Sequence, residues 1–252
     1  MNILETIAVA FSMYSAVPMP QFSWNAGNMK YSLCAFPLVG LLTGLLCWLI
    51  YAVLTAIRLP QIFTAAVLTA VPVLITGGIH IDGYADTQDA LSSHADRDKK
   101  LVILSDPHIG SFAVIRICIS FIITFACWAS LRSFAVIPLI ICFCQSRVLS
   151  ALAVSAFPLA KNTGLAYAFA DAMDRQKVKK ILCVIDIILV IIQCICGISG
   201  LAMTLACHIV FAYYYFMSKK NFGGITGDLA GWFLVQSEKI MLLVLVLVQF
   251  IF

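Results

Sequence analysis

The stretch Tyr31–Ile57, YSLCAFPLVGLLTGLLCWLIYAVLTAI, decides the fold class of this chain. It carries no Asp, Glu, Lys or Arg and is interrupted only by Pro37 and small residues. About 20 consecutive apolar residues in a helix cross the hydrocarbon core of a bilayer. The stretch is therefore predicted to be a membrane-spanning helix.

The rest of the chain has the same character, with 62% hydrophobic and 11% charged residues. Soluble domains carry about 25% charged residues, so the composition indicates an integral membrane protein. Met1–Val17 is too short to cross the core and is predicted to be an interfacial or re-entrant helix. Ile181–Met217 is too long for one span, so two spans are expected to meet near Gly197–Gly200. The other predicted membrane segments are Leu59–Thr76, Ile109–Leu131, Ser133–Phe157 and Leu229–Phe252.

The predicted fold is therefore all-α, a polytopic transmembrane helical bundle of roughly six to eight membrane segments that forms one domain over residues 1–252. The ten cysteines lie in apolar runs without a C-x-x-C pair, so they are expected to act as small hydrophobic residues rather than as zinc ligands or redox pairs. The net charge of +4 does not indicate nucleic acid as a partner.

The basic residues divide unevenly between the two sides of the predicted bundle. If each segment crosses once, the polar loops near 25–30, 80–108, 158–180 and 218–228 share one face, with eleven Lys and Arg residues against two on the other. The eleven are Lys30, Arg97, Lys99, Lys100, Lys161, Arg175, Lys177, Lys179, Lys180, Lys219 and Lys220. Basic loops stay in the cytoplasm, so the polar loops are expected to face the cytosol from the cell membrane.

One acidic motif stands out in the longest polar stretch. Asp82, Asp86 and Asp89 are spaced at i, i+4 and i+7, which places three carboxylates on one face of a helix. Their mutual repulsion near a membrane boundary would be relieved by a divalent cation, and carboxylates without thiolates favour Mg²⁺ or Mn²⁺. Gly77 and Gly78 just before them allow phosphate oxygens to approach the backbone. The alternative is a solvated acidic loop paired with the basic residues of 97–100.

A second cluster of glycine and acid follows at Gly223–Asp228, GGITGD. Both clusters read Gly-Gly-Ile with an Asp four residues after the second glycine, so we expect both to line one cavity. The alternative is a simple glycine-rich turn between two spans.

Three further residues are candidates from their positions. Arg147 lies inside a predicted span, where a charge is expensive, and would either reach a phosphate or pair with Asp186. Arg116 lies nearer the membrane–water interface. It would either have a functional role or extend its side chain to place the charge at that interface. His80, within the acidic motif, would contact a phosphate or transfer a proton.

The string Gly77–Asp86, GGIHIDGYAD, followed by Asp106–Gly110, DPHIG, resembles the cobalamin synthase family, the membrane adenosylcobinamide-GDP ribazoletransferases. Further matches in order along the chain are Val17–Pro20, Phe36–Gly40, Gly44, Gly223–Asp228 and Glu238. The resemblance implies that adenosylcobinamide-GDP is joined to α-ribazole or its 5′-phosphate, giving adenosylcobalamin or its phosphate and GMP, with Mg²⁺.

The predicted site combines the motif with this resemblance, and its active-site loops lie near 76–110, 158–180 and 218–228. Asp82, Asp86 and Asp89 are the expected Mg²⁺ ligands (Mn²⁺ as the alternative), with Asp106 and Asp228 as further ligands. Asp89 and His80 are the candidates for the general base. The residues expected to contact substrate phosphates are Gly77, Gly78, Arg147, Lys161, Gly224 and Thr226. The expected partners are the corrinoid nucleotide, α-ribazole and the lipid bilayer; a homo-oligomer or a complex with other cobalamin-assembly enzymes stays open.

Two rival functions make different demands on the sequence. A CDP-alcohol phosphotransferase needs D-G-x-x-A-R, whereas this chain has Asp82-Gly-Tyr-Ala-Asp86. A cation-coupled transporter places its acids near the bilayer midplane, whereas here only Asp186 clearly lies within a span and the others cluster at a boundary. Both rivals are therefore disfavoured.

Overall fold

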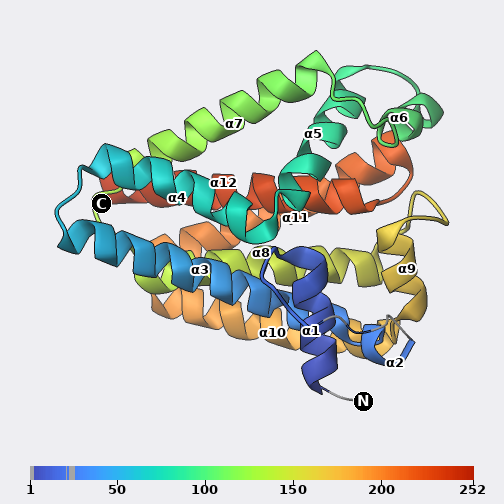
Figure 1. Cartoon of the computed structure of the whole chain (residues 1–252), viewed down its shortest axis with the longest axis horizontal. Coiled ribbons are helices and arrows are strands. Elements are labelled where there is room, and N and C mark those ends of the chain that lie inside the picture. Colours follow the sequence, from blue (N-terminus) through green and yellow to red (C-terminus); the bar gives the residue numbers. More distant parts are fainter. Residues whose placement is uncertain (1–2, 21, 23–25) are drawn as a thin grey trace.

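The computed structural model describes residues 3–20, 22 and 26–252 and shows a bundle of helices (Figure 1). Within these ranges the regular structure is helical apart from one isolated β-bridge, between Leu159 and Ile225. The helices are α1 (Ile3–Tyr14), α2 (Ala26–Met29), α3 (Ser32–Ala56), α4 (Gln61–Thr76), α5 (Ile79–Ser92), α6 (Arg97–Ile103), α7 (Ser111–Ser130), α8 (Val136–Ala156), α9 (Leu165–Ala172), α10 (Arg175–Ile195), α11 (Ile198–Phe222) and α12 (Gly227–Ile251).

Five helices are long and apolar enough to cross a membrane, namely α3, α7, α8, α11 and α12. The pair α4 and α5 adds a sixth only if both count as one span, and the two meet at 95°. The all-α polytopic bundle is confirmed, with five or six candidate spans against the roughly six to eight expected. We treat α5, which carries the acidic motif, as a helix at the membrane boundary and not as part of a span.

The expected break in the long apolar segment Ile181–Met217 is confirmed. Helix α10 ends at Ile195 and α11 begins at Ile198, with Gly197 between them at a φ of +83°. A φ of this sign is disfavoured for residues with a Cβ and is readily adopted by glycine. The glycine therefore permits the reversal that sends α11 back along the bundle.

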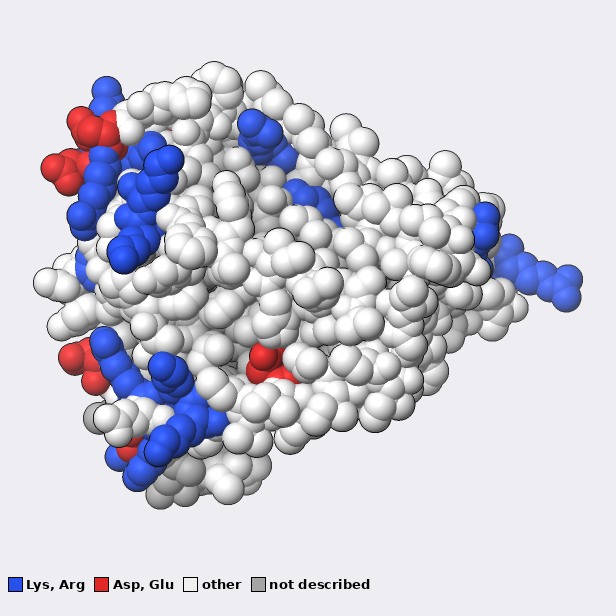
Figure 2. Space-filling view, turned by 180° about the vertical axis from the view of Figure 1, so that it is seen from behind, with Lys and Arg blue, Asp and Glu red and all other residues white. Residues whose placement is uncertain are grey.

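The two ends of the bundle differ in charge. Helices α6 and α9 lie at one end, here called the polar end, whereas the C-terminus and the turn between α3 and α4 lie at the other (Figure 1). Figure 2 shows Lys and Arg side chains gathered with acidic ones at one end, and only basic side chains at the opposite tip. The charge asymmetry expected from the loops is therefore present along the long axis of the molecule.

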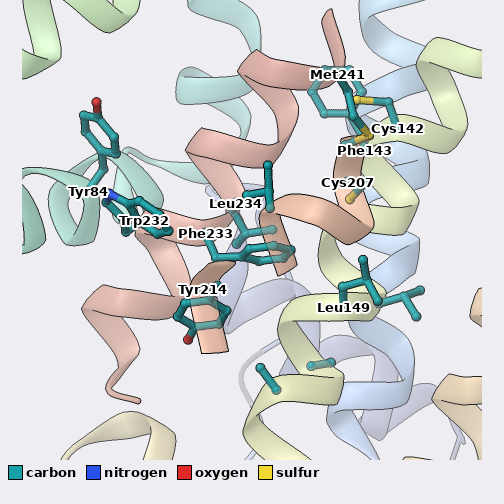
Figure 3. Close-up of a cluster of buried hydrophobic side chains, with 14 of the residues drawn as sticks. Tyr84, Cys142, Phe143, Leu149, Cys207, Tyr214, Trp232, Phe233, Leu234 and Met241 are labelled. Atoms are coloured by element: carbon teal, nitrogen blue, oxygen red, sulfur yellow. The ribbon is translucent and has the colours of Figure 1, made fainter. Parts of the chain in front are cut away.

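Helix α8 is the centre of the bundle, since nearly every residue from Pro138 to Ser155 is buried. It packs against α3 at two glycines: a Cβ on Gly40 would lie 2.2 Å from the Phe143 carbonyl oxygen, and one on Gly44 would lie 2.7 Å from the Ile140 Cα. Small residues let membrane helices approach closely where lipid offers no hydrophobic driving force. The remaining core contains aromatic side chains of α11 and α12, including Tyr214 and Phe233, whose ring centroids are 5.1 Å apart (Figure 3).

Candidate active site

The acidic motif is positioned by a sharp turn at the end of α4. Gly77 and Gly78 both take left-handed backbone conformations, with φ of +65° and +83°, and α5 leaves at 95°. Their N–H groups donate to the carbonyls of Leu74 and Val73. Both donors are thus occupied, so the expected binding of phosphate by these N–H groups is not supported. The two glycines make the turn that swings α5 across the bundle.

Helix α5 then packs directly on the start of α12 through glycines. A Cβ on Gly83 would lie 2.8 Å from the backbone of Asp228, and one on Gly231 would lie 3.1 Å from the carbonyl oxygen of His80. This close approach brings the two Gly-Gly-Ile clusters together although they are far apart in sequence. A cavity of about 130 Å³ is lined by residues of both, including Asp82 and Asp228. The prediction that both clusters line one cavity is confirmed.

The other walls of this cavity are aromatic and apolar. Tyr14 of α1, Phe36 of α3 and Phe169 of α9 line it, with Tyr14 4.2 Å from Phe36 and 5.8 Å from Phe169 between ring centroids. The cavity therefore offers two carboxylates on one side and ring faces on the other. With a cation held by the two carboxylates, such a surface would suit a ligand that combines planar rings with phosphate.

Four carboxylates are close enough to influence one another. The pKa of Asp86 is raised to about 6, first by partial burial and then by the charges of Asp82, Asp228 and Asp89. In the described part of the chain, Asp82, Asp86 and Asp228 take part in no ion pair. Among the described residues, the basic side chains of 97–100 take part in no ion pair, and Lys100 donates to Asn221 at 2.8 Å. The alternative of a salt-bridged acidic loop is therefore disfavoured.

Asp89 has a different role from its neighbours. One carboxylate oxygen accepts from the N–H of Gly110 and the other from the N–H of Ala113, at 2.5 and 2.8 Å. These donors belong to the first turn of α7, where N–H groups lack partners within the helix. Asp89 thus ties α5 to the start of α7, which leaves it poorly suited to bind metal or to act as a general base. A Cβ on Gly110 would lie 2.3 Å from this carboxylate, so a larger residue would disturb the contact.

The carboxylates of the cluster supply part of what a divalent cation needs. Among the described residues, no three His, Cys, Asp or Glu side chains are already arranged around one point. However, Asp82, Asp86 and Asp228 supply hard oxygen donors from two packed helices and take part in no ion pair among the described residues, which fits Mg²⁺ or Mn²⁺. These three would hold the ion. Asp89, which the sequence predicted as a ligand, is therefore left out of the expected ligand set because its oxygens accept hydrogen bonds from Gly110 and Ala113.

Asp106 and Lys161 lie in a separate open hollow of about 630 Å³ beside the cavity. Asp106 accepts from the backbone N–H of His108 and contacts its ring, and these bonds hold the pKa of that carboxyl below its usual range. Lys161 donates to the Leu101 carbonyl and to Ser105. Lys161 also lies within electrostatic range of Asp228, whereas Asp106 is not among the charges that act on Asp86. Lys161 thus borders the acidic cluster and Asp106 lies apart from it.

Gly224 and Thr226 organise the second cluster. A Cβ on Gly224 would lie 2.5 Å from the carbonyl oxygen of Pro158, so the glycine lets two loops pair closely. The Ile225 N–H donates to that same carbonyl at 2.8 Å. The Thr226 hydroxyl accepts from the N–H of Leu229 and caps α12. Both residues therefore position Asp228, and their contact with substrate stays a prediction.

The side chain of His80 in α5 is buried, and its Nε2 has no hydrogen-bond partner. Burial, and secondarily Arg147, lower the pKa of His80 to about 3. The ring is therefore neutral near pH 7 and a weak base. His80 lines two cavities: the one that Asp82 also lines, and a second, smaller one of about 80 Å³.

Arg147 lies on the wall of that smaller cavity and is fully buried. Its guanidinium donates to Glu238 of α12 and to Ser146. Asp186, the alternative partner considered, instead contacts His208 at 3.0 Å. Glu238 was missed as a partner of Arg147, although a lone acid and a lone arginine inside apolar helices are a signal for such a pair.

A family model described as cobalamin-5-phosphate synthase matches residues 6–246. The chain belongs to this family. Three relatives are named adenosylcobinamide-GDP ribazoletransferase. That of Lachnoclostridium phytofermentans is 39% identical over 99% of this chain and 96% of its own. Those of Clostridium perfringens and Geobacillus sp. are 29% and 34% identical, over 93% and 86% of this chain and 94% and 86% of their own.

No solved structure matches the chain significantly. Membership of the cobalamin-5-phosphate synthase family makes the chain a transferase of cobalamin synthesis. The resemblance carried by Gly77–Asp86 and the later motifs is thereby confirmed.

Proposed function

We propose that this chain joins adenosylcobinamide-GDP to α-ribazole or α-ribazole 5′-phosphate. The products are GMP and adenosylcobalamin or its 5′-phosphate. The family supports this proposal, as do the names of the relatives at up to 39% identity.

The observation that carries the proposal is the meeting of Asp82 and Asp86 of α5 with Asp228 of α12. Three carboxylates that take part in no ion pair could hold a cation for a diphosphate ester, and the aromatic walls of the neighbouring cavity suit planar rings. Mg²⁺, or Mn²⁺ in its place, would neutralise the charge of the diphosphate and align the reacting groups when bound.

The reaction forms a bond between a free ribose hydroxyl oxygen of the ribazole, other than the 5′-oxygen that carries the phosphate in the alternative substrate, and the phosphorus on the cobinamide side. The bond from that phosphorus to the oxygen bridging to GMP breaks, GMP leaves with that oxygen, and the hydroxyl proton passes to a carboxylate of the cluster. Tyr14, Phe36 and Phe169 would stack on the planar base of the ribazole. A carboxylate of the cluster would accept the hydrogen bond of the attacking hydroxyl, since Asp89 is bonded to α7 and His80 is a weak base. Lys161 would neutralise phosphate oxygen at the rim of the cluster.

The site would open to the cytosol from the cell membrane. The bias of eleven basic residues against two between the loops on the two sides supports this orientation, because basic loops stay in the cytoplasm. GMP and the soluble substrate would then enter and leave on the cytosolic side.

The test supplies the purified protein, in lipid nanodiscs, with adenosylcobinamide-GDP, α-ribazole and Mg²⁺, and follows GMP by chromatography. We expect GMP from the wild type, almost none from Asp82→Asn, and wild-type amounts from Asp98→Asn, an exposed acid of α6 outside the site. Absence of GMP with the wild type, or full activity of Asp82→Asn, would contradict the proposal.

A further inference from the structure

Two basic side chains lie side by side within the apolar helices α7 and α12, away from the acidic cluster. The Lys239 ammonium donates to the hydroxyl of Ser120 at 3.2 Å and lies 5.2 Å above the ring of Tyr84. Arg116 lies four residues before Ser120 and therefore on the same face of α7. It is close enough to Lys239 to interact electrostatically. Two positive charges of α7 and α12 thus lie close enough to repel each other.

Neither charge is neutralised by the protein itself. Among the residues that the structure describes, neither Arg116 nor Lys239 takes part in an ion pair. Glu238 is adjacent to Lys239 in sequence, but its carboxylate is bonded to Arg147 and Ser146. A charge in an apolar span is expensive, and two like charges together are more so. An anion from outside the chain would remove this penalty.

The surroundings of the pair identify the kind of anion. Arg116 is exposed, and its neighbours Phe112, Ile115 and Ile119 are 56%, 52% and 44% exposed on an apolar helix. Figure 2 shows basic side chains standing apart from the charged end of the molecule on otherwise uncharged surface. A free phosphate would match the two charges but not the exposed apolar side chains around them. A molecule that joins a phosphate to acyl chains matches both the charges and the apolar rim.

The depth of the pair is that of a phospholipid headgroup. Helix α7 begins at Ser111 at the polar end, and five residues at 1.5 Å per residue place Arg116 about 8 Å along it. The Lys239 side chain extends to Tyr84 on the boundary helix α5. The ammonium and guanidinium therefore meet near the boundary between headgroups and acyl chains.

We propose that Arg116, Ser120 and Lys239 form a binding site for the phosphate of an anionic phospholipid. None of these three residues lines the cavity that holds Asp82, and the proposed site does not depend on the function proposed above. A bound lipid would fasten α7 to α12 next to the helix that carries the acidic motif.

The test measures the binding of phosphatidylglycerol by native mass spectrometry of protein taken from nanodiscs of phosphatidylcholine with graded phosphatidylglycerol. Near a membrane surface each basic residue contributes about a fivefold change in binding to anionic lipid. We expect Arg116→Gln and Lys239→Gln each to weaken binding about fivefold, and the double variant about thirtyfold. Arg132→Gln, at the opposite end of α7, is the matched control and should bind as the wild type does.

Two further arms decide the identity of the ligand. Arg116→Lys and Lys239→Arg keep the charge and should retain binding, which separates a charge effect from a loss of folding. Inorganic phosphate at millimolar concentration should leave the bound lipid in place, and adenosylcobinamide-GDP should do so too. Unchanged lipid binding by the double variant would overturn the proposal, as would displacement of the lipid by either soluble phosphate.

Discussion

Replacement of Asp86 by Asn should stabilise the metal-free protein at neutral pH while it removes activity. The pKa of Asp86 is raised from 3.8 to about 6 by partial burial and by Asp82, Asp228 and Asp89. A shift of about two units corresponds to about 3 kcal/mol for a group shielded from solvent. Asp86 is only partly buried, so solvent screening lowers the expected gain to about 1 kcal/mol. In a chain of this size that is about 2–4 °C in the midpoint of thermal unfolding.

The sign of the pH dependence follows from the raised pKa. In the folded state Asp86 is charged above pH 6, and its repulsion by the neighbouring carboxylates opposes folding. As the pH falls from 6 toward 4, Asp86 becomes protonated in the folded state before it does so in the unfolded state, which relieves this penalty. The wild type should therefore gain stability over that interval relative to Asp86→Asn, in which this group no longer titrates.

The measurement is the midpoint of thermal unfolding in detergent with a chelator, at pH values from about 4 to 8, for the wild type, Asp86→Asn and the control Asp98→Asn. Excess Mg²⁺ should raise the midpoint of the wild type and leave that of Asp86→Asn nearly unchanged. A destabilised Asp86→Asn at pH 7.5, or a stabilisation by Mg²⁺ of the same size in both proteins, would show that Asp86 does not belong to a repulsive cluster that a cation relieves.

Three further substitutions test the contacts around the site. Asp89→Asn should lower the unfolding free energy by about 1–2 kcal/mol, in contrast to Asp86→Asn, because the first turn of α7 loses a charged cap; equal or higher stability would contradict the capping role. Gly83→Ala should abolish GMP formation, since its Cβ would lie 2.8 Å from the α12 backbone, whereas Gly227→Ala has open space and should keep activity; equal rates for both would refute the close packing. Glu238→Gln should destabilise the protein by about 3–5 kcal/mol because Arg147 would remain buried without its counter-charge, and an unchanged unfolding midpoint would count against the pair.

The architecture was predictable because it depends on local composition. In a bilayer, a single apolar run of about 20 residues can satisfy its backbone polar groups only as a helix. Tyr31–Ile57 and the other long apolar segments were therefore predicted to be helices. The reversal at Gly197 follows from the length of the segment around it. The repeated Gly-Gly-Ile pattern with a following acid also placed Asp82 and Asp228 in one cavity, although only the packing of Gly83 explains how close they come.

The partners of individual charges were not predictable because they depend on how helices distant in sequence pack. The spacing of Asp89 places it with Asp82 and Asp86 on one helix face, but its carboxylate turns to the N-terminus of α7, which is 21 residues further along. Arg147 had a nearby acid in Asp186, yet it pairs with Glu238, which is 91 residues away in sequence. A helical repeat shows which residues share a face, whereas the neighbouring helix decides which of them remain free to bind a ligand.

The central claim is that acids from α5 and α12 act together as one site, and the rate of GMP formation by Asp228→Asn tests it most directly. Asp228 is far in sequence from the acidic motif, so its importance follows from the packing of the two helices. We expect the rate with adenosylcobinamide-GDP, α-ribazole and Mg²⁺ to fall about a hundredfold or more, as for the loss of one preorganised group that stabilises the transition state. A rate within a factor of two of the wild type, in a variant that unfolds at the same temperature, would contradict the claim.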